Sequence, residues 1–239
     1  MKILNFGSLN LDFTYQVDHL VLPGETIASD SFKINLGGKG LNQSIALAHA
    51  GAEVYHAGKI GKDGTALRAF LERNNVNTGF IANSESSTGH AIIQVDASGQ
   101  NSIILYSGAN RTMTFEFIHS IISEFEQGDV LLLQNEVNAL NIIMEEAHKK
   151  GMKIALNPSP CDDSILKLPL HYVKWFFINE IEGWMLTGKH SPEDIVSEML
   201  SRYPNSVIIL TLGEKGVLYG DKLNRYVHPA YNVCAADTT

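Results

Sequence analysis

Residues 37–43 read Gly37-Gly38-Lys39-Gly40-Leu41-Asn42-Gln43, and they join a strand-like segment to a helical pattern. Glycines at such a turn let a ligand approach the backbone N–H groups closely, and a helix N-terminus favours anions or polar oxygens. The stretch is not a Walker A loop, because the six-residue glycine spacing and the Ser or Thr after Lys are absent. It also lacks the third glycine of the dinucleotide-binding pattern. Taken alone, it fits a ligand-binding turn and a plain tight turn equally well.

The rest of the chain alternates between apolar, strand-like runs and helical patterns. Nearly continuous apolar runs are typical of parallel strands covered on both faces, and strands are expected at 3–6, 130–133, 153–156, 175–178 and 207–210. Helices are expected at about 41–50, 65–74, 115–125, 138–150 and 192–202. This order predicts an α/β fold with a doubly wound, mostly parallel sheet in three layers.

Two regions depart from that rhythm because apolar and polar residues alternate in them. The alternation runs through 13–17, 32–36, 90–95 and 102–106, and the last two segments flank the short loop Asp96-Ala97-Ser98-Gly99. Period-two alternation indicates strands with one apolar face. We therefore expect a small β-lid formed by 13–36 and 88–107 over a main domain formed by 1–12, 37–87 and 108–239. Edge hairpins of one sheet are the alternative.

Polar residues follow the first expected strand, in the segment Gly7-Ser8-Leu9-Asn10-Leu11-Asp12. In an open α/β sheet, ligands bind at the carboxyl ends of the strands. Asn10 and Asp12 are two residues apart, so on an extended segment they share one face. An amide and a carboxylate can together hold sugar hydroxyls, which both donate and accept hydrogen bonds. An ordinary Asx turn is the alternative interpretation.

Further polar groups follow four later strands. They are Gln134-Asn135-Glu136, Asn157-Pro158-Ser159-Pro160, Asn179-Glu180-Ile181-Glu182 and Thr211-Leu212-Gly213-Glu214-Lys215-Gly216-Val217. Each alone is more often a cap or a loop, and the last is also typical of a β-hairpin turn. Their repetition predicts one polar rim along the edge of the sheet, and the glycines of the last segment leave room for a nucleotide.

Composition narrows the function classes. The net charge of −8 argues against a nucleic-acid-binding protein. The two cysteines, Cys161 and Cys234, have no metal-site spacing and are expected to be reduced thiols of a cytoplasmic protein. The N-terminus has neither the charge nor the apolar length of a signal peptide, and no stretch reaches membrane-spanning length, so no membrane partner is expected.

Taken in order, these motifs resemble the ribokinase family of sugar and nucleoside kinases, the phosphofructokinase-B type, over essentially the whole chain. The most specific match is 37–43, which resembles the family signature Gly-Gly-Lys-Gly-x-Asn-Gln. The remaining matches are 7–12, Pro23-Gly24-Glu25-Thr26, 58–64 (a turn before a helix), Thr88-Gly89, Gly108-Ala109-Asn110, 157–160 and 179–182. The resemblance implies a ribokinase-like fold and an ATP-dependent kinase acting on a primary hydroxyl of a small sugar.

The resemblance also implies roles for individual residues. The sugar would be held by Asn10, Asp12, Gly38, Lys39, Asn42 and Glu136. The nucleotide would lie against Asn179, Thr211, Gly213 and Gly216. Glu182 would organise Mg²⁺ through water, and Asp237 and Thr239 would contribute to a monovalent-cation site, with K⁺ as the candidate ion. Because family members commonly dimerise through the lid, a homodimer is expected.

The resemblance stops at Thr239. The family continues Asp-Thr-Thr with Gly-Ala-Gly-Asp, whose glycines form an anion hole and whose Asp is the general base. We therefore expect no catalytic residue and no meaningful kinase activity in the 239 residues alone, and we expect the natural product to be longer. Asn10, Asp12 and Gln43 favour ribose as substrate, giving ribose 5-phosphate. A nucleoside kinase, a fructokinase and a non-catalytic sugar-binding or regulatory protein are the alternatives.

Overall fold

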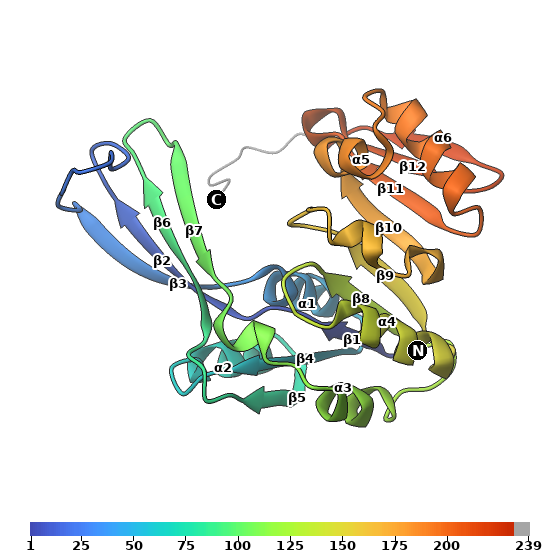
Figure 1. Cartoon of the computed structure of the whole chain (residues 1–239), viewed down its shortest axis with the longest axis horizontal. Coiled ribbons are helices and arrows are strands. Elements are labelled where there is room, and N and C mark those ends of the chain that lie inside the picture. The colour runs from blue at the N-terminus through green and yellow to red at the C-terminus, as the bar shows by residue number, and fades with distance from the viewer. Residues whose placement is uncertain (232–239) are drawn as a thin grey trace. The chain divides into compact units, whose positions relative to one another are not determined.

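The computed structural model describes residues 1–231. Its chain forms two compact units, an N-terminal unit, Met1–Met152, and a C-terminal unit that begins at Lys153. Both units combine strands with helices, so the chain has the predicted mixed α/β fold with a mostly parallel sheet (Figure 1). The domain boundaries predicted above for the main domain and the lid stay predictions.

Four parallel strands form the centre of the N-terminal unit, in the order β8-β1-β4-β5. Their bounds are Ile3–Phe6 (β1), Val54–Ile60 (β4), Asn77–Asn83 (β5) and Val130–Gln134 (β8). Side chains of β1 and β8 are almost entirely buried, which explains their nearly continuous apolar sequence. Leu9, Leu41, Ile60, Leu67 and Leu71 belong to one fully buried cluster, so the helix after residue 37 is fixed to the sheet by packing.

The N-terminal unit also contains four helices and one 3-10 turn. Their bounds are Lys39–His49 (α1), Thr65–Arg73 (α2), Gly108–Arg111 (η1), Phe115–Ile122 (α3) and Leu140–Lys150 (α4). The predicted helix at 138–150 begins two residues late, because Ala139 takes a left-handed conformation with φ 59°. The predicted turn at 58–64 is confined to 61–64, because residues 58–60 complete β4.

A separate four-stranded sheet, in the order β3-β2-β6-β7, projects from the rest of the N-terminal unit (Figure 1). Its strands are Asn10–Gln16 (β2), Ser31–Gly37 (β3), Gly89–Val95 (β6) and Asn101–Tyr106 (β7). These strands include the four alternating segments, except that β2 ends one residue before Val17. One expectation was wrong. Ile103, Ile104 and Leu105 are consecutive in β7, so apolar side chains occupy both of its faces, and all three are exposed.

Within residues 153–231, the C-terminal unit has five strands in the order β13-β12-β11-β10-β9. β9, β10 and β11 are parallel, whereas β12 and β13 are antiparallel to their neighbours. The strands are Lys153–Asn157 (β9), Val173–Asn179 (β10), Val207–Thr211 (β11), Val217–Gly220 (β12) and Arg225–His228 (β13), and the helices are Glu180–Thr187 (α5) and Pro192–Arg202 (α6). Short 3-10 turns span Ile165–Lys167 (η2), Leu170–Tyr172 (η3) and Gly213–Lys215 (η4).

Within residues 1–231, every helix is too short or too polar to cross a lipid bilayer.

Candidate active site

The turn at 37–43 brings helix α1 against the connection between β1 and β2. Gly38 is the N-cap of α1 with φ 99°, a conformation that favours glycine. Gly40 is required for a different reason, since a Cβ at that position would overlap the backbone of Gly7 and Ser8. The glycines of this motif therefore allow the first turn of α1 to approach the end of β1 closely.

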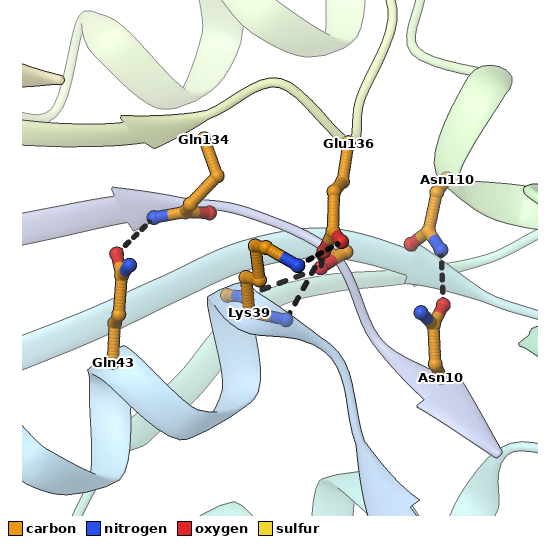
Figure 2. A network of polar contacts seen from close by, with 8 residues as sticks. Asn10, Lys39, Gln43, Asn110, Gln134 and Glu136 are labelled. Carbon is orange, nitrogen blue, oxygen red and sulfur yellow. Dashed lines mark hydrogen bonds and ion pairs between the residues drawn. The ribbon is translucent and has the colours of Figure 1, made fainter. Parts of the chain in front are cut away.

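Glu136 places its carboxylate at the N-terminus of α1. Its Oε2 accepts hydrogen bonds from the Lys39 backbone N–H at 3.0 Å and from the Ser8 hydroxyl, and its Oε1 lies 3.3 Å from Lys39 Nζ (Figure 2). A carboxylate at this place benefits from the positive end of the helix dipole. Only 7% of the Glu136 side chain is exposed, compared with 41% of the Lys39 side chain. The pair thus offers a fixed carboxylate and a partly solvated ammonium group.

Asp12 lies next to this pair on strand β2. Burial raises the pKa of its carboxyl group, the negative charge of Glu136 raises it further, and the positive charge of Lys39 opposes the shift. Gly37 is paired with Asn10 in the sheet, and a Cβ on Gly37 would overlap the Asp12 carboxylate. Asp12, Lys39 and Glu136, which come from three distant parts of the sequence, therefore interact electrostatically within one site.

Asn10 is held by Asn110, a residue of the η1 turn. Nδ2 of Asn110 donates to Oδ1 of Asn10 at 2.8 Å (Figure 2). Asn110 also bonds both backbone groups of Leu9, accepting from its N–H at 3.0 Å and donating to its carbonyl at 3.3 Å. Asn10 and Asn110 are 4% and 1% exposed, respectively. Sequence reasoning did not find this contact, although Gly108-Ala109-Asn110 was among the matching motifs.

A buried polar chain lies behind the turn. Asn5 donates to the Gly40 carbonyl at 2.7 Å and to the Ser44 hydroxyl at 2.8 Å, and it accepts from Gln134 at 3.0 Å. Gln134 also donates to Gln43 at 2.6 Å (Figure 2). These contacts attach α1 to β1 and β8 through side chains that sequence reasoning did not single out, apart from Gln43 and Gln134. The available signal was the amide of Asn5 within the apolar run of residues 3–6, because an amide in a buried strand requires hydrogen-bond partners.

Asn42 is also predicted to bind the sugar, but its side chain makes none of the contacts described above. It is exposed on the first turn of α1, and its backbone N–H donates to the Gly38 carbonyl at 3.0 Å. The structure thus gathers Asn10, Asp12, Gly38, Lys39 and Glu136 around the N-terminus of α1, with Asn42 exposed on the same helix.

Asn179 and Thr211 lie side by side in the C-terminal unit, because they are paired at the ends of β10 and β11. Asn179 caps α5 in a capping box with Glu182: its side chain accepts from the Glu182 N–H at 2.8 Å, and Glu182 Oε2 accepts from the Asn179 N–H at 3.0 Å. This reciprocal bonding satisfies two N–H groups of the helix end. Glu182 is buried, with 6% of its surface exposed.

Gly213 and Gly216 belong to the hairpin between β11 and β12. Both have positive φ, 56° and 98°, and Leu212 donates from its N–H to the Gly216 carbonyl at 2.8 Å. A Cβ on Gly216 would overlap the backbone of His228. The alternative interpretation of this motif as a hairpin turn is confirmed, and the hairpin leaves Gly213 and Thr211 exposed at its end.

The chain matches a known protein family. The family model described as "pfkB family carbohydrate kinase" matches residues 1–239. The chain belongs to the pfkB family of carbohydrate kinases. This pfkB-family chain is 32% identical over 245 residues to the ribokinase of Bacillus subtilis (strain 168), covering 100% of the chain and 80% of the relative. It is 35% identical over 249 residues to the ribokinase of Staphylococcus aureus (strain COL), covering 100% and 81%.

A solved structure shows the same fold. The crystal structure of ribokinase from Cryptococcus neoformans var. grubii serotype A, in complex with ADP, superposes on the pfkB-family chain with a TM-score of 0.78 and 30% sequence identity. The match covers 97% of the chain and 79% of the solved structure. The family resemblance predicted from the motifs is thereby confirmed, as is the fold class.

Among residues 1–231, no group of three or more His, Cys, Asp or Glu side chains is placed to hold a metal ion. The predicted monovalent-cation residues, Asp237 and Thr239, lie outside the described residues. Glu182 commits one carboxylate oxygen to its capping box, so it fits a hydrated ion that is held chiefly by other groups, such as the phosphates of a nucleotide.

Proposed function

We propose that this chain belongs to a sugar kinase whose substrate is D-ribose and whose product is ribose 5-phosphate. The observation that carries the proposal is the interaction of Asp12, Lys39 and Glu136 at the N-terminus of α1, directly beside the fixed amide of Asn10. The site combines donors and acceptors at short range, as a polyhydroxylated ligand requires. The ribokinases of two bacteria among its relatives support the choice of ribose.

The sugar residues have complementary chemistry in this proposal. Asn10 and Asp12 bind neighbouring hydroxyls from one face of β2. Lys39 donates to a sugar oxygen and keeps Glu136 oriented. Gly38 and Asn42, at the start of α1, complete the sugar site. Such positioning is the main contribution of a protein to phosphoryl transfer, because the protein itself forms few covalent bonds in that reaction.

For the nucleotide, we propose that ATP binds against Asn179, Thr211, Gly213 and Gly216. The ADP complex of the Cryptococcus ribokinase supports a nucleotide partner for this chain. Mg²⁺ would neutralise phosphate charge when bound, with Glu182 contacting it through water. The positive φ of Gly213 and the exposed end of the hairpin leave room for a ligand. Asp237 and Thr239 remain candidates for a monovalent-cation site such as K⁺.

In the complete reaction, the γ-phosphoryl group would pass in line to the primary hydroxyl of the sugar while the β-lid excludes water. The sequence Gly-Ala-Gly-Asp, which carries the anion hole and the general base of the family, does not occur in the 239 residues. We therefore propose that a polypeptide of these residues alone binds the sugar and does not transfer phosphate.

A substrate panel tests the function. Ribose, fructose, adenosine and inosine are titrated calorimetrically into the 239-residue chain, and ADP release is followed on the same preparation in a coupled assay. We expect saturable binding of ribose and background ADP release. Preferred binding of adenosine or inosine would favour a nucleoside kinase, and preferred binding of fructose would favour a fructokinase. Normal turnover with ribose would contradict the proposed inactivity of the isolated polypeptide.

We further propose a homodimer formed through the four-stranded sheet. Phe32, Ile34, Ile92, Ile104 and Tyr106 share one face by register and are all exposed, and exposed apolar patches of this kind mark protein contacts. Light scattering coupled to size-exclusion chromatography should give twice the mass of the chain, and an Ile34→Glu variant should run as a monomer. A monomeric wild-type chain at high concentration would contradict this proposal.

A further inference from the structure

The hydrogen bonds of Asn110 have a fixed direction. A backbone N–H can only donate and a backbone carbonyl can only accept. The Leu9 N–H therefore requires the oxygen of the Asn110 amide, and the Leu9 carbonyl requires its nitrogen. These two contacts assign the amide orientation of Asn110 independently of any ligand, which side-chain amides by themselves do not permit.

The orientation of the Asn110 amide also fixes the orientation of the Asn10 amide. Because Asn110 offers Nδ2, the atom of Asn10 that lies 2.8 Å away must be its oxygen. The Asn10 nitrogen is then turned away from Asn110, and in Figure 2 it lies on the side of the view that holds Lys39 and Glu136. Asn10 consequently presents a hydrogen-bond donor toward the site.

A second observation shows that the two side-chain amides are closely packed. Gly89 is paired with Asn10 across β2 and β6, and a Cβ on Gly89 would overlap both Asn110 Nδ2 and Asn10 Oδ1. The hydrogen bond between the two amides is therefore packed against the Gly89 Cα. Any larger residue at position 89 would displace one of the two side chains.

We infer that Asn110 is a positioning residue that locks the Asn10 amide with its donor toward the sugar. The inference rests on the proposed function, since it concerns the same site. Asp12, on the same face of β2 as Asn10, supplies an acceptor when ionised. A donor beside an acceptor suits sugar hydroxyls, which accept from the first and donate to the second. With the Asn10 amide reversed, two acceptors would compete for the hydroxyl hydrogens.

An Asn110→Asp variant tests the inference. Its carboxylate still accepts from the Leu9 N–H, but it can no longer donate to Asn10, so the Asn10 amide should turn its nitrogen toward residue 110. We expect ribose affinity to fall about tenfold or more, the factor that corresponds to one lost hydrogen bond. Asn138→Asp is the matched control, because Asn138 makes the same two bonds to the Met113 backbone, each 2.9 Å long, without contacting the Asn10 side chain.

A spectroscopic measurement separates positioning from a general loss of structure. With ¹⁵N-asparagine labelling, the side-chain NH₂ signals of Asn10 in the wild-type chain should shift on addition of ribose, whereas those of Asn110 should exchange slowly with solvent throughout. In Asn110→Asp, the Asn10 signals should already be shifted without ribose and should respond little to it. The wild-type part of this measurement holds even when the variant fails to fold.

The outcomes are distinguishable. Ribose binding by the wild-type chain with unchanged affinity in Asn110→Asp, or with unperturbed Asn10 NH₂ signals, would overturn the inference and leave the proposed function standing. Equal affinity losses in Asn110→Asp and Asn138→Asp would also overturn it. An absence of ribose binding in the wild-type chain would overturn the proposed function itself, and the inference with it.

Discussion

Oδ1 of Asn5 lies 3.0 Å from Nε2 of Gln134, and both side chains are completely buried between neighbouring strands β1 and β8. The direction of this bond is set by Gly40, whose carbonyl accepts from Asn5 Nδ2 and so leaves the Asn5 oxygen for Gln134. The second hydrogen of Gln134 Nε2 is donated to Gln43 Oε1. The turn at 37–43 is thus held by buried side-chain amides whose oxygen and nitrogen positions are fixed by their hydrogen bonds.

Replacing Gln134 with Glu should destabilise the fold. A glutamate carboxylate has no hydrogens to donate, and at this position it would face the oxygens of Asn5 and Gln43 without contact with solvent. We expect the free energy of unfolding to fall by about 3 kcal/mol or more, because a buried charge would be left without partners. Urea denaturation at pH 7.5 measures this. Gln134→Met, which removes the bonds without adding charge, should cost less; an equal or greater loss in Gln134→Met would contradict the explanation.

His56 should make stability depend on pH. It is fully buried, its Nδ1 lies 2.8 Å from Ser44 Oγ, and burial lowers its pKa to about 4, against a weaker opposing interaction with the Gly7 backbone. Since the unfolded chain binds this proton with a pKa near 6.5, the stabilisation is complete above pH 6.5 and is lost as the pH falls toward 4. The loss over that window is about 3 kcal/mol.

Urea midpoints of the wild-type chain and of His56→Gln at several pH values check this expectation. The wild-type midpoint should fall more steeply than that of the variant between pH 6.5 and 4.5. Parallel curves for the two proteins would show that His56 does not contribute the buried, neutral imidazole described here.

Gly89→Ala should weaken ribose binding, although alanine can adopt the backbone conformation of residue 89. Gly89 does not have a positive φ, so alanine is disfavoured there by contacts: its Cβ would enter the Asn10–Asn110 hydrogen bond and would also lie 2.9 Å from the Ser107 carbonyl oxygen. We expect an affinity loss of about tenfold or more by calorimetry. Gly79→Ala is the control, since the nearest atom to a Cβ there is Asn77 Oδ1, a side-chain atom 3.1 Å away. Equal ribose affinity in the two variants would contradict the packing argument.

Lys39→Ala should reduce ribose affinity far more than it reduces stability. Lys39 Nζ is partly solvated, and Glu136 keeps its bonds from Ser8 and from the backbone of residue 39 in the variant. We therefore expect the ribose affinity to fall at least tenfold while the midpoint of thermal unfolding stays nearly unchanged. Lys153→Ala, an exposed change in the C-terminal unit, serves as control. An unchanged ribose affinity in Lys39→Ala would show that Lys39 does not bind the sugar.

Local signals predicted much of the fold. Helix α6 matches its expected bounds because Ser191 accepts from the Asp194 N–H as an N-cap and Pro192 occupies the first turn. Helix α5 was not predicted, since Gly183 interrupts its pattern; in the structure this glycine leaves room for Ile195 of α6. Close packing between elements of this kind has no signature within one segment.

Part of the candidate site could be anticipated from the sequence. Asn10, Asp12, Lys39 and Glu136 were predicted as site residues because family motifs mark them and because ligands bind at strand ends, and their roles stay predictions. Asn110, Ser8 and Asn5 were missed as site residues because their role is to orient neighbours that are about 100, 128 and 129 residues away along the chain. Such contacts depend on how distant strands pair, which a single sequence does not reveal.

A ribose site around α1 can be tested by calorimetric titration of ribose into the wild-type chain and into Asp12→Ala. We expect saturable, one-to-one binding per chain in the wild type and an affinity loss of at least tenfold in the variant. Identical heats in both proteins, or no binding of ribose by the wild-type chain, would contradict it.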